Sequence, residues 1–351
     1  MIRMLHTADW HLDAPLRNFT DLQRRELRAS LLELPGKIAD LSIREGCDLA
    51  VLSGGIFDGP GSRESYEAVY RCLERMEIPV FVVPGGTDPY REDSIWAREE
   101  WPDNVFFFKS DAPSSFSIRE LDCRIYGAAC PGPEGSGLPE EFRAECDERH
   151  VLLALWADPG DPDTAARIRD AGVDYAALGG SRDRVRLEAG GALCAWPGSP
   201  MGRDFTEPGT RGVLIAELDE GVRLRFEALE GPRFYSYSVD AMSDPLGAVT
   251  AVLPEGGSTD HFRVRVTGRV RPEVMDRLPE HLSLWPNLTI LDKTTPQEDL
   301  WAGAGEDTLT GLFFRNLRDA AQTADPAEAE LQELAARISR RLLAGEEVEL
   351  P

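Results

Sequence analysis

The chain has 351 residues, of which 42% are hydrophobic, and 38 lysines and arginines against 62 aspartates and glutamates give a net charge of −24. A chain of this length predicts two domains, and its hydrophobic content suffices for a sizeable core. The charge argues against binding to nucleic acid over the whole surface, because proteins of that class neutralise phosphates with lysine and arginine. No apolar run reaches the roughly 18 residues of a membrane-spanning helix.

The first residues and the cysteines predict a cytoplasmic protein. The segment MIRMLHTADWHLD passes from a short strand directly into a polar loop, which leaves no room for the apolar core of a secretory signal. No pair of cysteines has the C-x-x-C spacing of zinc or redox motifs. We therefore expect six free thiols in a reducing compartment, at Cys47, Cys72, Cys123, Cys130, Cys146 and Cys194.

The first part of the chain alternates apolar strands with helices. Near-continuously apolar strands in such an alternation predict a layered α/β sheet with helices on both faces. The strands are expected at 3–9, 47–54 and 79–86, and the helices at 22–46, interrupted at Pro35, and at 62–78.

After about residue 110 the strands follow one another more closely, which predicts a second sheet packed on the first. One hairpin is expected to turn at Asp219, Glu220 and Gly221. Two helices are predicted near the end of the chain, and the second starts at Asp325 and Pro326, which suit the N-cap and N1 positions. We predict domains at 1–230 and 231–300, the second a small α/β domain, and a helical tail at 301–351.

Two stretches alternate arginine with apolar residues, VRLRF at 222–226 and RVRVTGRVRPE at 263–273. Alternate residues of a strand point to the same side of a sheet. We expect these arginines to line the solvent face of a strand, although they are also the best candidates for a local basic patch.

Five loops that each follow a strand carry the polar and glycine residues of interest. In folds of this class, the loops at the carboxyl ends of strands hold the chemistry. In chain order they are TADWHLD (7–13), SGGIFDG (53–59), PGGTDP (84–89), LWADPG (155–160) and LGGSRDR (178–184).

This order resembles the calcineurin-like metallophosphoesterases, and most of all the SbcD/YhaO branch of DNA repair exonucleases. Flanking segments such as IPVFVVPGGTDPY and WPGSPMGRDFTEPGTRGVLIAEL are similar to that branch, and the resemblance covers residues 1–230 strongly. It implies an αββα sandwich. It also implies two manganese ions held by seven ligands in the pattern D-x-H, G-D-x-x-D, G-N-H-D, H and G-H-x-H, with an additional histidine that assists phosphate chemistry.

Only part of this pattern is present. Asp9 and His11 match D-x-H and are interpreted as vestigial metal ligands. Asp58 and Asp88 are further candidate ligands for a single metal, and both carboxylates also suit turns or caps. The family's assisting histidine is replaced by Thr87. The remaining five ligand positions carry residues without a metal-binding side chain, namely Gly55, Gly86, Trp156, Gly180 and Arg182. We therefore expect no cofactor, or at most one weakly bound divalent metal.

Three hypotheses concern the substituted loops. The Arg182 guanidinium is expected to replace a missing cation and pair with Asp9. Trp156 is expected to fill the volume of the second metal. Gly54, Gly85 and Gly179 are expected at turns that need a positive φ.

Relocated histidines could in principle replace the lost ligands. His150 precedes Trp156 by six positions on one strand, so it should lie at the opposite end of that strand. His6 lies within the first strand and is expected to point into packing. The remaining histidines, His261 and His281, fall in the predicted second domain.

The resemblance and the lost ligands together predict a catalytically inactive SbcD/YhaO-like homologue that acts as a binding or scaffolding subunit. The resemblance implies an SbcC-like coiled-coil ATPase as partner, docked by the C-terminal helices, and also a homodimer. DNA is doubtful as a ligand at this net charge. The alternative is an active manganese-dependent DNA exonuclease or phosphoesterase with relocated ligands, and a third option is a cleft that binds a small ligand or phosphate without hydrolysis.

Overall fold

The computed structural model describes residues 1–130, 138–139, 141–241, 244–296 and 299–345. The chain divides into two compact units. The first comprises residues 1–237, 255–264 and 284–289, and the second comprises 238–254, 265–283 and 290–351. The three-part division expected from the sequence stays a prediction.

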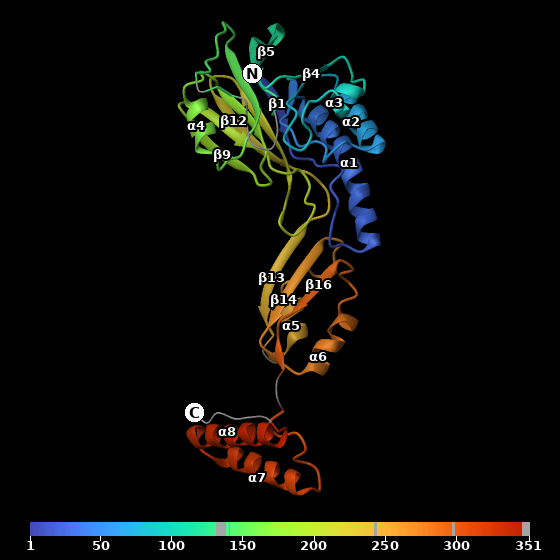
Figure 1. Ribbon diagram of the computed structural model, residues 1–351, viewed down its shortest axis with the longest axis vertical. Coiled ribbons are helices and arrows are strands. Elements are labelled where there is room, and N and C mark those ends of the chain that lie inside the picture. The colour runs from blue at the N-terminus through green and yellow to red at the C-terminus, as the bar shows by residue number, and fades with distance from the viewer. Residues whose placement is uncertain (131–137, 140, 242–243, 297–298, 346–351) are drawn as a thin grey trace. The chain divides into compact units, whose positions relative to one another are not determined.

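The first unit contains two six-stranded sheets packed face to face (Figure 1). The first sheet has the order β12 (Val222–Ala228), β11 (Gly212–Leu218), β1 (Ile2–Thr7), β2 (Leu49–Leu52), β3 (Val80–Val82) and β4 (Val105–Phe107). The second has the order β5 (Ser114–Ile118), β6 (Cys123–Gly127), β7 (His150–Trp156), β8 (Tyr175–Gly179), β10 (Ala192–Trp196) and β9 (Val185–Ala189).

Helices cover the outer faces of both sheets. The helices α1 (Asp21–Glu45) and α2 (Arg63–Met76) share one apolar core with the first sheet. The helix α4 (Pro162–Arg169) packs on the second sheet through the buried Ile168. Two short elements, α3 (Ile95–Arg98) and η1 (Arg119–Leu121), complete this part of the chain. The expected αββα layering is confirmed.

The helix α1 runs without interruption through Pro35, so the break expected there is wrong. Proline removes one backbone hydrogen bond and usually kinks a helix. Here the buried face of α1, which includes Leu31, Leu34 and Ile38, packs on the first sheet and offsets that cost. Reciprocal hydrogen bonds between Thr20 and Gln23 cap the helix start.

The sheet topology gathers the five loops at one edge. Strands β1, β2 and β3 are parallel neighbours in the first sheet, and β7 and β8 are parallel neighbours in the second. Carboxyl ends of parallel strands meet at the same edge of a sheet. Strands β11 and β12 form the expected hairpin, which pairs Leu218 with Val222.

The remaining strands and helices are short, apart from two helices near the end of the chain. One sheet has the order β13 (Phe234–Asp240), β14 (His261–Thr267) and β16 (Leu288–Asp292), and another pairs β15 (Arg269–Val270) with β17 (Thr295–Pro296). The helices are α5 (Pro245–Thr250), α6 (Pro272–Arg277), η2 (Leu278–His281), α7 (Leu309–Thr323) and α8 (Pro326–Leu343).

Asp325 caps α8 as predicted, because its carboxylate accepts from the N–H groups of Ala327 and Glu328. In the part of the chain that the structure describes, no helix has the length and apolar character needed to cross a membrane.

Candidate functional site

The five loops converge at the carboxyl ends of β1, β2, β3, β7 and β8. The Asp9 N–H donates to the Gly54 carbonyl at 2.9 Å, and the Gly180 N–H donates to the Asp9 carboxylate at 2.9 Å. These two bonds join the first, second and fifth loops. The backbones of Gly54 and Gly85 approach so closely that a Cβ on Gly54 would lie 2.7 Å from the Gly85 Cα, which joins the third loop.

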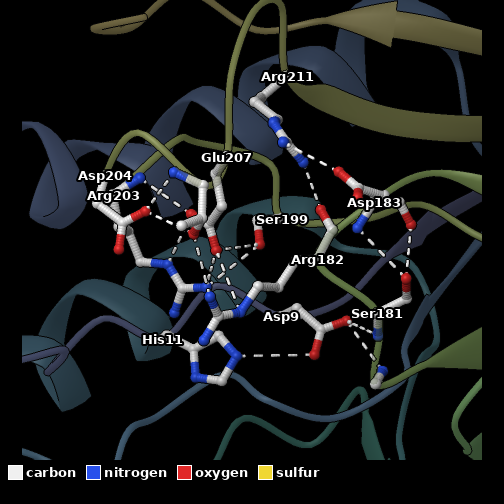
Figure 2. A network of polar contacts seen from close by, with 12 residues as sticks. Asp9, His11, Ser181, Arg182, Asp183, Ser199, Arg203, Asp204, Glu207 and Arg211 are labelled. Atoms are coloured by element: carbon white, nitrogen blue, oxygen red, sulfur yellow. Dashed lines mark hydrogen bonds and ion pairs between the residues drawn. The ribbon is translucent and has the colours of Figure 1, made fainter. Parts of the chain in front are cut away.

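Asp9 and His11 lie side by side in an uncommon backbone conformation. Their φ angles are 56° and 47°, in the left-handed region that residues other than glycine rarely occupy. Such conformations cost roughly 1–3 kcal/mol each and concentrate at functional sites. The His11 Nε2 lies 3.7 Å from the Asp9 Oδ1, and the Asp9 Oδ2 accepts N–H bonds from Gly180 and Ser181 (Figure 2).

Asp88 ties the second and third loops together through its carboxylate. One oxygen accepts from the N–H groups of Gly55 and Gly85, and the other accepts from those of Ile56 and Phe57, at 2.9–3.3 Å. Burial raises the pKa of Asp88 to about 6, and these hydrogen bonds oppose that rise. Both oxygens of this carboxylate are therefore occupied by backbone N–H groups of the second and third loops.

The two other candidate side chains of these loops are not held in the same way. The Thr87 hydroxyl donates to the Phe57 carbonyl at 3.0 Å. Asp58 is half-buried and makes no side-chain hydrogen bond or ion pair with the described residues. Asp88 therefore stabilises the turns of these loops, as expected, whereas the Asp58 side chain makes no hydrogen bond that would stabilise a turn or a cap among the described residues.

The indole of Trp156 packs against the backbone of four glycines from three other loops. A Cβ built on Gly54 or on Gly85 would lie 2.7 Å from the indole Cδ1. A Cβ on Gly86 would lie 2.8 Å from Cη2, and one on Gly180 would lie 3.0 Å from Cε2. Contacts below 3.0 Å are essentially unknown for real Cβ atoms, so the ring occupies the space that side chains at these positions need.

The Trp156 ring leaves one polar atom unpaired. Its Nε1 is buried and has no hydrogen-bond partner among the described residues. A buried donor without a partner costs about 1–3 kcal/mol. The packing of the indole must offset this cost.

Gly55 stands directly against Asp9. Its φ is 68°, and a Cβ there would lie 2.8 Å from the Asp9 Oδ1. A carboxylate at this position, where the metal-bridging group is expected, would collide with Asp9 unless the loop moved. The backbone conformation and the available space therefore both favour glycine.

The expectation for three further glycines is confirmed only in part. Gly54 has a φ of 81° as predicted, but Gly85 and Gly179 do not have a positive φ. They are glycine because other backbone comes close. A Cβ on Gly179 would lie 1.7 Å from the Ser53 carbonyl oxygen, and one on Gly85 would lie 2.7 Å from the Gly55 nitrogen.

The expected pairing of Arg182 with Asp9 is wrong. The Arg182 side chain is 63% exposed, its Nε lies 3.9 Å from the Glu207 Oε1, and its Nη1 donates to the Thr206 hydroxyl at 3.1 Å (Figure 2). The physical reason is that Asp9 already accepts two backbone N–H groups, whereas Glu207 is buried and attracts cations.

Glu207 is the centre of a network that sequence reasoning missed. It accepts from the Arg203 backbone and guanidinium and from the Ser199 hydroxyl. The spacing of four residues between Arg203 and Glu207 was the available signal, but such pairs are common on surfaces. Nothing in the pattern indicated that this pair would be buried.

The candidate histidines outside the pattern lie away from Asp9 and His11 or are already bonded. His150 begins β7 and Trp156 ends it, so His150 lies at the opposite end of the strand, as expected. His6 is fully buried as expected, with Nδ1 2.8 Å from the Tyr175 hydroxyl and Nε2 3.3 Å from the Ser53 hydroxyl. Burial lowers the pKa of His6 to about 3.

The donor set at this edge does not fit a two-metal centre. Divalent metals of this type take several oxygen and nitrogen ligands each. Asp9 and His11 supply two, and Asp88 is held by backbone donors. Across the described ranges, no group of three or more histidine, cysteine, aspartate or glutamate side chains is placed to hold a metal ion.

Comparisons with known proteins identify two curated relatives. The chain is 26% identical over 239 residues to the uncharacterized metallophosphoesterase YhaO of Bacillus subtilis, which covers 63% of this chain and 58% of that protein. It is 27% identical over 143 residues to the SbcD component of the nuclease SbcCD from Rhodobacter capsulatus, which covers 39% of this chain and 29% of the relative. The chain thus spans just over half of the first relative and less than a third of the second.

Among solved structures, a dimetal phosphatase from Danio rerio matches with a TM-score of 0.44 and 14% identity, over 65% of this chain and 98% of that structure. No protein-family profile matches the chain.

Proposed function

We propose that this chain, which is similar to the metallophosphoesterase YhaO and to the SbcD subunit of a nuclease, is a non-catalytic SbcD/YhaO-like metallophosphoesterase homologue that acts as a binding or scaffolding subunit. The observation that carries this proposal is the position of the Trp156 indole. The ring lies against Gly86 and Gly180, two positions at which the related pattern places metal ligands.

The chemistry of the family explains why these substitutions matter. Two-metal hydrolases use a pair of cations to activate a water molecule and to stabilise the charge that builds on phosphate. A site without a bridging carboxylate cannot hold such a pair. Asp9 and His11 supply donors for one cation, and the N–H groups of Gly180 and Ser181 compete with it for the Asp9 Oδ2.

Metal content tests the proposal directly. Purified protein is dialysed against excess manganese and then against buffer, and manganese is measured by elemental analysis beside phosphodiesterase activity on bis(p-nitrophenyl) phosphate. We expect essentially no bound metal and no turnover. The Asp9→Asn variant should match the parent, and so should Asp111→Asn, an exposed control outside the site.

The opposite result has a clear meaning. About two manganese ions per chain, with activity lost in Asp9→Asn and retained in Asp111→Asn, would overturn the proposal. The active exonuclease or phosphoesterase with relocated ligands would then be the better description.

We further propose that the α7–α8 hairpin docks the partner of this protein, an SbcC-like coiled-coil ATPase. The two helices enclose a small core that includes Phe314 and Ala336. Their other surface exposes an apolar groove of about 590 Å³. The groove is lined by Leu309, Thr310, Leu312, Phe313, Asn316, Ser339, Leu342 and Leu343. Grooves of this kind accept amphipathic helices.

Co-purification with a coiled-coil ATPase from the same organism tests the docking surface. Phe313, 44% exposed, is replaced by aspartate, and Leu22, an exposed leucine of α1, is replaced in the control. We expect Phe313→Asp to abolish the complex and Leu22→Asp to leave it intact. Loss of a homodimer rather than of an ATPase complex would identify a second copy of the chain as the occupant.

The arginines at 222–226 are paired with glutamates, which argues against DNA binding through this stretch. Arg225 pairs with Glu45 and Glu227, and Arg223 lies 3.8 Å from Glu217. Both arginines lie on the exposed side of β12, as predicted. A guanidinium that is already paired with a carboxylate is a poor substitute for the counterions of a phosphate backbone.

A further inference from the structure

A polar cavity of about 670 Å³ lies in the first unit, at the end of β7 opposite to Trp156. This volume is within the range of small-molecule sites. Its wall is built from the start of β7, the residue before β8, the β9–β10 hairpin and the β11–β12 turn. The lining includes Arg149, His150, Asp174, Arg186, Glu188 and Glu220.

His150 supplies an unpartnered polar group in this wall. The residue is only 7% exposed, and its ring makes no hydrogen bond or ion pair with the described residues. Burial lowers the pKa of His150, so the imidazole is neutral near pH 7 and one ring nitrogen is an acceptor. A nearly buried acceptor that faces a cavity is suited to a ligand N–H.

The two arginines of the cavity are each engaged by a neighbouring acid. Arg149 lies 3.7 Å from the Asp219 carboxylate and also donates to the Asp219 carbonyl at 3.3 Å. Arg186 lies 3.6 Å from Glu188. The positive charges of the wall are therefore balanced by these two carboxylates.

Two further carboxylates have no such balance. The Asp174 Oδ2 accepts the Val151 N–H at 2.7 Å, which fixes the side chain and leaves the other oxygen available. Neither Asp174 nor Glu220 has a cationic partner within the ranges that the structure describes. The cavity thus combines an excess of negative charge with the His150 acceptor.

We propose that this cavity binds a small organic cation that carries two or more primary ammonium groups. One ammonium group is held by Asp174 and donates an N–H to His150, and a second is attracted to Glu220. A bare metal ion is disfavoured, because the described residues offer no cluster of three metal-ligating side chains. This site is independent of the loops around Trp156 and needs no assumption about metal or catalysis.

Isothermal titration of the full chain with putrescine and spermidine tests the site, and the uncharged diol analogue of putrescine serves as the negative probe. We expect saturable one-to-one binding of both amines and none of the diol. Asp174→Asn keeps the acceptor for the Val151 N–H but removes the charge, and it should weaken binding by about tenfold. Glu220→Gln changes an exposed turn, where folding is not at risk, and it should weaken the binding of spermidine by about threefold.

The matched control is Asp103→Asn, which removes the same charge from an exposed position outside the cavity. Its affinity for both amines should stay within about twofold of the parent value. Equal weakening by Asp103→Asn and Asp174→Asn would show only diffuse attraction to a chain of net charge −24 and would overturn the proposal. So would the absence of saturable binding, or binding of the diol as tight as that of putrescine.

Discussion

Replacement of Trp156 tests whether one indole holds the substituted loops together. Trp156→Ala removes a ring that packs on Gly54, Gly85, Gly86 and Gly180, and the glycines have no side chains with which to refill the space. Truncation of a fully buried tryptophan to alanine costs about 3–5 kcal/mol. Because Trp156 is partly exposed, we expect a loss near the lower end, about 3 kcal/mol.

Trp156→Phe separates packing from hydrogen bonding. Phenylalanine keeps much of the ring area but removes the Nε1–H, which is buried without a partner among the described residues. Removal of this unpaired donor stabilises the fold by about 1–3 kcal/mol, which offsets the packing energy lost with the smaller ring. We expect a net change within about 1 kcal/mol. Trp101→Phe is a matched control, because the Trp101 Nε1 is buried and unpaired in the same sense but does not face this glycine shell.

The assay is urea denaturation followed by far-UV circular dichroism, since replacement of a tryptophan alters fluorescence directly. Stability is taken from the transition of the first unit, because two units need not unfold together. A loss below about 1 kcal/mol in Trp156→Ala would refute the reasoning, since the loops would then be held without the indole. A gain of bound manganese in the same variant would refute the wider proposal.

Three further predictions concern buried groups near the same loops. Acidification from about pH 7.5 to 5 should lower the free energy of unfolding by about 2 kcal/mol through His6, because its pKa is about 3 in the folded state and 6.5 in the unfolded chain. This stabilisation is present above pH 6.5 and is lost as the pH falls. Denaturation at both pH values should show a shallower pH dependence in His6→Asn. Gly179→Ala should destabilise by about 3 kcal/mol or more in urea denaturation, because the added Cβ would lie 1.7 Å from a backbone oxygen. Asp9→Asn should change the melting temperature little, because the amide oxygen still accepts two N–H groups. Asp9→Ala should lose about 2 kcal/mol of unfolding free energy. Equal losses in both variants would contradict this prediction.

The features that follow from local periodicity could be predicted from the sequence. Apolar strands followed by polar loops predicted a layered α/β fold with the candidate residues in loops after the strands, and these loops bring Asp9, Gly54 and Gly180 together. The hairpin at Asp219 and the N-cap at Asp325 follow from turn and cap chemistry that acts over a few residues. Such signals are local, so a single sequence carries them.

The features that depend on competition between distant groups could not be predicted. The direction of Arg182 depends on the burial of Glu207 and on the N–H groups that already satisfy Asp9, and no local pattern encodes either. Gly179 is glycine because Ser53, more than a hundred positions away, places its carbonyl there. Pro35 lies within a continuous helix because the packing of α1 outweighs one lost hydrogen bond.

The substitutions at the five loops are physically coupled through Trp156. A ligand side chain at Gly86 or Gly180 would collide with the indole, and one at Gly55 would collide with Asp9. Restoring any single ligand position therefore costs stability without completing a metal site, because the other donors are still missing. Loss of Trp156 alone would open the space but supply no donor. Two-metal catalysis at these loops would therefore need several simultaneous changes, each unfavourable by itself, which supports the binding role that we propose.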